Sequence, residues 1–189
     1  MNQRIVEPEQ ILMHDDASPR HESILKIYFR AFDKGLGHIL PPVLIARPKL
    51  SLRHYILDRL VAFARAEYQR LFEQVDELGE AFYLMDGVHR GFAAALCHSE
   101  IRALELEDDR DLVDLERMVQ EGSYFNLPAY HTELPGLPAA ETRLSAAVTD
   151  LEMFHLREVL TLRKAVDALV EQCSLPAYMV RRYAASRAG

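Results

Sequence analysis

The chain has 189 residues, a formal net charge of −7 and two cysteines, Cys97 and Cys173, in apolar surroundings. This length suffices for one domain with a substantial core plus appendages, and the acidic balance disfavours a general nucleic-acid coat protein while permitting a local basic patch. The cysteines have no metal-binding spacing, and no apolar run reaches membrane-spanning length. We therefore expect reduced cysteines in the core of a soluble, cytoplasmic protein with no membrane partner.

Two short strands and a helix are predicted at the start of the chain. Residues 4–6 and 11–13 are short extended segments, and the polar residues 14–17 follow as a loop. Ser18-Pro19 predicts the start of the helix, because Ser caps helices and Pro suits the first helical position. Its apolar stripe consists of Ile24, Leu25, Ile27, Tyr28, Ala31 and Phe32.

A buried strand and a long helix come next. Gly35 and Gly37 end the first helix, and the apolar run 43–46, bounded by prolines, predicts a buried strand. Residues 51–78 keep near-helical apolar spacing until Gly79 and predict one long helix. Its apolar face must pack against the C-terminal helices or against a partner subunit.

The most informative stretch is a strand, turn, helix and strand. Residues 82–85 predict a buried strand, Asp86-Gly87 a tight turn, residues 88–97 a helix and residues 101–106 an alternating strand. Together these elements predict a mixed α/β (α+β) fold.

The C-terminal third is predicted to be mostly helical. The acidic run 105–111 indicates a solvated edge and the start of a helix over 109–120. Residues 122–138 predict an irregular connection, residues 139–173 one long helix, and residues 177–185 a short helix after Pro176. One long helix and a short tail do not make a helix-turn-helix, which disfavours sequence-specific DNA binding.

The helix start at Gly87 suits an anion, because helix N-termini present backbone N–H groups and a positive dipole end. His89 and Arg90 add donors, and Asp86 is placed to hold a metal ion, orient His89 or accept a proton from a hydroxyl. Structural alternatives stand beside this hypothesis: Asp86 as a helix cap, and Arg90 as its ion-pair partner or that of the acidic run. The joint occurrence of these residues favours a phosphate site.

The sequence Asp86-Gly87-Val88-His89-Arg90, followed by Ala93-Ala94, resembles the signature of the ParB/sulfiredoxin superfamily. Chromosome-partition proteins carry Gly-x-x-Arg-x-x-Ala, which Gly87, Arg90 and Ala93 match. Free-serine kinases and many proteins named ParB-like nucleases carry Asp-Gly-x-His-Arg, which is matched at every specified position. The resemblance covers residues 4–110, and the helix 51–78 interrupts it.

The resemblance implies a ParB/sulfiredoxin-like domain over 1–110 with a helical insertion at 51–78, and a helical extension over 111–189. It implies that Gly87, Val88, His89 and Arg90 bind the phosphates of a nucleotide (ATP, ADP or CTP) or of another small phosphorylated ligand. Phosphoryl transfer to a small hydroxyl compound would use Asp86 and His89 as catalytic residues, Asp86 also as Mg²⁺ ligand, and Asp15 as base.

Two departures from the superfamily pattern narrow these implications. No Asn/Gln-Arg motif follows the signature, which argues against cytidine-triphosphate clamping, and Val88 replaces the sulfiredoxin cysteine, which leaves that reaction without a nucleophile. In the serine-kinase branch a His-Glu pair follows the first strand; here His14-Asp15 falls at the matching place with a shorter acid.

Two alternative functions stay open at this point. A non-enzymatic DNA-segregation or regulatory module would use a basic surface on the inserted helix, formed by Arg53, Arg59, Arg65 and Arg70, although Glu67, Glu73 and Asp76 share that helix. A nuclease is the third option. Apolar faces on the two long helices are compatible with a homodimer.

Overall fold

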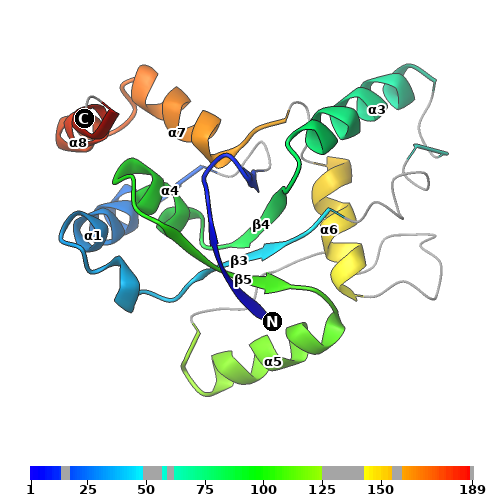
Figure 1. Cartoon of the computed structure of the whole chain (residues 1–189), viewed down its shortest axis with the longest axis horizontal. Helices are drawn as coiled ribbons and strands as arrows, with labels where there is room; N and C mark the ends of the chain where they lie inside the picture. Colours follow the sequence, from blue (N-terminus) through cyan, green and yellow to red (C-terminus); the bar gives the residue numbers. More distant parts are fainter. Residues whose placement is uncertain (14–17, 49–56, 59–61, 125–142, 155–158, 188–189) are drawn as a thin grey trace.

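The computed structural model describes residues 1–13, 18–48, 57–58, 62–124, 143–154 and 159–187 (Figure 1). The fold is α+β, with a five-stranded mixed sheet in the order β1-β5-β3-β4-β2. Its strands are β1 (Asn2–Val6), β2 (Ile11–Leu12), β3 (Val43–Ala46), β4 (Phe82–Asp86) and β5 (Ile101–Leu106). The β1–β5 and β3–β4 pairs are antiparallel, and the β3–β5 and β2–β4 pairs are parallel.

Helices cover both faces of this sheet (Figure 1). One face carries α1 (Glu22–Asp33), α4 (Val88–Leu96), α7 (Leu162–Glu171) and α8 (Ala177–Arg187). The other face carries α3 (Ala62–Glu77), α5 (Asp109–Gln120) and α6 (Arg143–Phe154), and the 3-10 turn η1 (Gly37–Ile39) precedes β3.

The central strands are apolar throughout because both of their faces are buried. In β4, Phe82 and Leu84 belong to the hydrophobic cluster under α1 and α4, whereas Tyr83 and Met85 belong to the cluster under α3 and α6. Successive side chains of a strand point to opposite faces, so a strand between two helical layers needs apolar residues at every position. The predicted buried strands at 43–46 and 82–85 are confirmed on this basis.

The start of α1 corrects one prediction, because the helix begins at Glu22 and not at Ser18-Pro19. His21 is the N-cap residue in an extended conformation, and its backbone N–H donates to Nε2 of His89 at 3.2 Å. This contact with the start of α4 competes with helix formation at residues 18–21. The predicted end is confirmed: Gly35 has a φ of +73°, and the Leu36 N–H donates to the Ala31 carbonyl at 2.8 Å.

The prediction of one long helix over 139–173 is wrong. The chain forms α6, and after residues 155–158, outside the described part, Val159 and Leu160 are not helical. The Met13 N–H donates to the Leu160 carbonyl at 2.8 Å, and Thr161 forms a bridge to Leu12 and caps α7. These contacts to β2 interrupt the helix. Since α7 and α8 are two short helices joined at residues 172–176, the premise used against a helix-turn-helix fails.

The acidic run 105–111 is only in part the solvated edge that its composition indicates. Glu107 and Asp108 are exposed, and Asp108 caps α5 by accepting from the N–H groups of Arg110 and Asp111. Glu105 and Asp111, however, are buried. Glu105 lies among arginines from β1 and from the end of β3, and this pairing compensates its burial.

The described part of the inserted helix, α3, packs against other helices of the same chain. Leu71 and Val75 of α3 lie in the same hydrophobic cluster as Leu144 and Val148 of α6, which agrees with packing against the C-terminal helices. Residues 57–58 are helical, and Gly79 follows the end of α3 as predicted. Most of 49–61 and residues 125–142 lie outside the described residues, and with them the start of the insertion and most of the predicted connection 122–138.

The prediction that both cysteines are core residues is right for one of them. Cys97 is buried, whereas Cys173 is exposed after the end of α7.

Candidate functional site

The candidate site is the junction between β4 and α4, which Gly87 makes possible. β4 ends at Asp86, Gly87 has a φ of +100°, and α4 begins at Val88. A Cβ at position 87 would lie 2.8 Å from Cγ1 of Val43 and 3.1 Å from Nη2 of Arg90. Both the left-handed backbone and the lack of space therefore require glycine.

Replacing Gly87 with Ala should lower the free energy of unfolding by about 1–3 kcal/mol, because the left-handed conformation is strained and the added methyl group collides with Val43. Gly79→Ala is the matched control, since Gly79 has a φ of +74° with open space around its Cα. Urea unfolding should show a smaller loss for the control. Equal losses would mean that contact with Val43 contributes nothing.

Arg90 points into the protein. It is 4% exposed. Its Nη2 donates to Oδ2 of Asp86 and to the hydroxyl of Tyr124, both at 2.8 Å, and its Nη1 donates to the Pro41 carbonyl at 3.3 Å. Its guanidinium also lies 5.2 Å from the centre of the Tyr124 ring. The predicted phosphate ligand is thus held by partners of its own chain.

Tyr124 completes this network and was not singled out by the sequence. Its hydroxyl lies 2.9 Å from Oδ2 of Asp86 and 3.2 Å from the Pro42 carbonyl. Burial raises the pKa of Tyr124 well above its usual value, so the phenol stays protonated and can donate to the carboxylate. Tyr124 follows α5 and lies 34 residues from Arg90 in sequence, and no local pattern indicates that contact.

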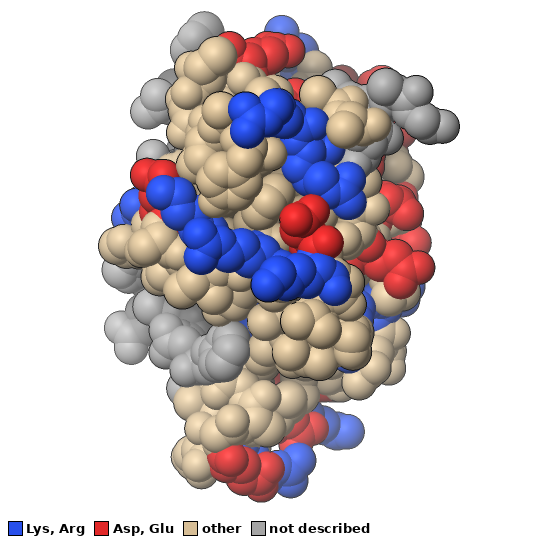
Figure 2. All heavy atoms as spheres, turned by 90° about the vertical axis from the view of Figure 1, so that its left-hand side faces the viewer, with Lys and Arg blue, Asp and Glu red and all other residues tan. Residues whose placement is uncertain are grey.

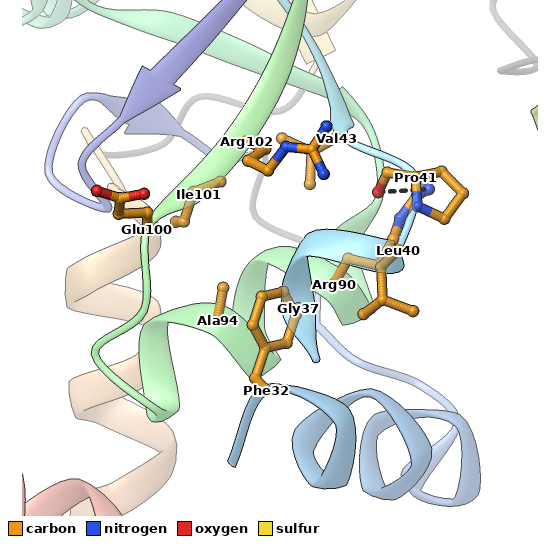
Figure 3. Close-up of a pocket in the computed structure, with 10 residues that line it drawn as sticks. All are labelled: Phe32, Gly37, Leu40, Pro41, Val43, Arg90, Ala94, Glu100, Ile101 and Arg102. Atoms are coloured by element: carbon orange, nitrogen blue, oxygen red, sulfur yellow. Dashed lines mark hydrogen bonds between the residues drawn. The ribbon is translucent and has the colours of Figure 1, made fainter. Parts of the chain in front are cut away.

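A small cavity borders the Arg90 side chain. Figure 3 shows Arg90 reaching toward Pro41, with Phe32 and Ala94 also lining the cavity. Its volume is about 20 Å³, which is room for about one water molecule. This cavity is therefore too small to be a binding site for a nucleotide.

Two histidines lie together at the start of α4. The rings of His21 and His89 are stacked with centroids 6.1 Å apart, and Nε2 of His89 accepts the His21 backbone N–H. An accepting Nε2 places the proton of a neutral ring on Nδ1. Burial, and then the nearby His21, lower the pKa of His89 below its usual 6.5, against the opposing effect of Asp86.

The lowered pKa of His89 predicts a loss of stability on acidification. Below the unfolded-state pKa of about 6.5 the unfolded chain binds the proton more readily than the folded chain, so the free energy of unfolding falls as the pH drops through this value. His89→Gln should lose less stability than the wild type between about pH 7 and about pH 5.5 in urea titrations. Parallel losses in the two proteins would contradict this role of His89.

The structure brings together most, but not all, of the residues that the sequence nominated. Asp86, Gly87, Val88, His89 and Arg90 lie at one helix start, as predicted. Arg90 faces inward, however, and Asp15 lies outside the described residues. Sequence reasoning missed His21 and Tyr124. His21 lay within the first turn of the predicted helix, and no local pattern marked either residue.

The carboxylate of Asp86 is the candidate metal ligand. Its side chain is 32% exposed, and Oδ2 accepts from both Arg90 and Tyr124. Within the described ranges, His, Cys, Asp and Glu side chains do not gather in groups of three or more that would suit a metal ion. Any metal bound by these residues would therefore need most of its ligands from a substrate or from water.

The basic surface predicted on the inserted helix is only partly described. Arg65 and Arg70 are exposed on α3, and Glu67 and Glu73 are exposed beside them. Arg53 and Arg59 lie outside the described residues.

None of the helices formed by the described residues is both long and apolar enough to cross a lipid bilayer.

Comparison with known proteins adds no further constraint. The chain matches no family model, no curated protein and no solved structure. Inference of its function therefore rests on the residues and geometry of the chain itself.

Proposed function

We propose that the protein binds the phosphate group of a nucleotide, or of another small phosphorylated compound, at the N-terminus of α4 in a ParB/sulfiredoxin-like domain. The observation that carries this proposal is the helix start itself: Gly87, with a φ of +100°, begins α4 directly after β4, and two imidazole rings lie beside its first turn. The strand–glycine–helix arrangement and the Asp-Gly-x-His-Arg sequence support the same domain type.

The first turn of α4 supplies the donors for an anion. Backbone N–H groups of Val88, His89 and Arg90 have no acceptor within the helix, because the first four positions of an α-helix have no carbonyl before them. The helix dipole adds a partial positive charge at the same place. A bound phosphate would raise the pKa of His89, since an opposite charge favours the protonated ring, so binding should take up a proton and strengthen as the pH falls toward 6.5.

Arg90 acts on this site indirectly, from the interior of the protein. Its buried guanidinium donates to Asp86, the last residue of β4, and so links the first turn of α4 to that strand. The Arg90 side chain therefore positions the turn and contributes a positive field without a direct contact to the ligand. This role differs from the direct phosphate contact that the sequence resemblance implied.

The reaction that we propose for this site is phosphoryl transfer to a small hydroxyl compound. Mg²⁺ usually takes one or two carboxylates together with substrate phosphates, and Oδ1 of Asp86 is the carboxylate oxygen on which the described residues make no hydrogen bond. A Mg²⁺ ion held there would neutralise phosphate charge. His89 and the helix N-terminus would stabilise the transferring group, and Asp15 would serve as the base.

Thermal unfolding with ATP, ADP, CTP, GTP and pyrophosphate, each with and without Mg²⁺, tests the proposal. A ligand at a hundred times its dissociation constant adds about 2.7 kcal/mol, which shifts Tm by several degrees. The shift should be lost in His89→Ala and kept in His38→Ala, an exposed histidine of η1. No shift with any ligand, or equal shifts in both variants, would refute the site. A ligand that passes this test goes into a kinase assay.

A further inference from the structure

Helices α1 and α8 form a continuous face of the molecule. Arg182 of α8 is paired with Asp33 of α1 at 2.8 Å, and the rings of Phe29 and Tyr178 pack edge to face with centroids 5.5 Å apart. Figure 2 views the molecule from this side and shows Lys and Arg side chains gathered in a broad band across it. The two helices thus present one surface although they are distant in sequence.

The positive residues of α1 repeat at every fourth position. Lys26, Arg30 and Lys34 follow one another along the helix, the last as its C-cap. Residues four apart lie on the same side of a helix, about 6 Å apart along its axis. Arg181 and Arg182 of α8 add to them, and we call these five residues the basic band.

Part of the basic band is not neutralised. Lys26 pairs with Glu22 and Arg182 pairs with Asp33. Arg30, Lys34 and Arg181 are exposed and make no ion pair with any residue of the described ranges. The chain has a formal net charge of −7, which already keeps it away from zero charge. Three uncompensated cations on one face therefore have no role in solubility and call for another explanation.

We infer that the basic band docks on the sugar–phosphate backbone of duplex nucleic acid. The row of cations spaced along α1, with Arg181 beside it, suits an anion that repeats at regular intervals. Hydrogen bonds to phosphates position a protein without reading sequence. Among the α8 residues whose exposure is described, Ala177, Tyr178, Ala184 and Ala185 are exposed beside Arg181. These residues offer too few donors for base readout, so we expect docking that is independent of sequence.

A lipid surface fits this face less well. Amphipathic helices that bind membranes insert their apolar side, whereas Leu25 and Phe29 of α1 and Met179 of α8 are buried inside the protein. Ile24 and Ile27 of α1 are exposed, but two aliphatic side chains among charged neighbours are ordinary for a protein surface. The inference concerns a surface other than the start of α4, so it stands or falls independently of the proposed phosphate site.

Fluorescence anisotropy with a short labelled duplex, at salt concentrations from about 50 to about 200 mM, tests this inference. Three neutralised phosphates predict a slope of about −2.7 for log K against log salt, and hence about a 40-fold loss of affinity over this range. A second duplex of unrelated sequence should bind equally well. Absence of binding at the lowest salt would overturn the inference, as would binding of anionic phosphatidylserine vesicles in place of both duplexes.

Matched charge variants locate the contact. The variant Arg30→Gln/Lys34→Gln/Arg181→Gln should bind at least about 10-fold more weakly, with a slope near zero. Arg65→Gln/Arg70→Gln/Arg110→Gln changes the net charge equally at exposed positions of α3 and α5 and should keep the slope. Equal losses in the two variants would overturn the assignment. Should the first variant fail to fold, each single substitution should reduce the slope by about 0.9, and an unchanged slope would count against it.

Discussion

Asp86→Ala should destabilise the protein by about 3–5 kcal/mol, because it removes the carboxylate that compensates a buried guanidinium. Arg90 is 4% exposed, so water cannot replace this partner, and the Tyr124 hydroxyl and the Pro41 carbonyl offer no charge. Urea unfolding measures the loss as a fall in the midpoint at unchanged slope. A loss below about 1 kcal/mol would mean that Arg90 does not depend on Asp86.

The reverse substitution provides the control. Arg90→Met leaves Asp86, whose side chain is 32% exposed and stays partly hydrated, so its loss should be smaller than that of Asp86→Ala. The double variant Asp86→Ala/Arg90→Met should be more stable than the sum of the two single losses predicts, with a coupling energy of about 0.5–3 kcal/mol. Additive losses would show that the two side chains do not stabilise each other.

This result affects the choice of variants at the candidate site. Loss of ligand binding in an Arg90 variant would not separate a phosphate contact from unfolding of the helix start. His89 and His21 are partly or fully exposed and stack on each other, so their substitution leaves the core intact. The phosphate proposal is therefore tested at His89.

Arg4→Ala/Arg47→Ala should cost about 3–5 kcal/mol, since it leaves a buried carboxylate without a partner. Glu105 of β5 has an exposed fraction of 0%. It pairs with Nε of Arg4 and, at 2.6 Å, with Nε of Arg47. Both guanidinium groups also lie over the Phe82 ring, at 5.6 and 5.0 Å from its centre, so the double variant also loses cation–π contacts.

Glu105→Gln is the matched comparison for this second network. The two arginines that it leaves behind are 34% and 48% exposed and can be hydrated, and the amide oxygen still accepts a hydrogen bond. We expect a loss of about 1–2 kcal/mol in the same urea assay. A larger loss for Glu105→Gln than for the arginine double variant would contradict the view that burial of the carboxylate sets the cost.

Local signals explain which elements the sequence could predict. The borders of β3, β5 and α5 agree with the predictions, because apolar runs, alternation and an acidic helix start are visible within a few residues. The helix 139–173 was wrong because its interruption comes from backbone contacts of Leu160 and Thr161 to β2, almost the whole chain away. The Ser18-Pro19 start was wrong for the same reason, since His21 bonds to His89.

The sequence by itself determined the α+β class, the central strands and the glycine-started helix with Asp86, His89 and Arg90, because hydrophobic periodicity and glycine act over neighbouring residues. Only the tertiary structure decided that Arg90 turns inward to Asp86 and Tyr124, that Glu105 is buried between two arginines, and that α1 and α8 join their cations into one face. The direction of a charged side chain depends on partners far along the chain, and no local pattern encodes where those partners lie.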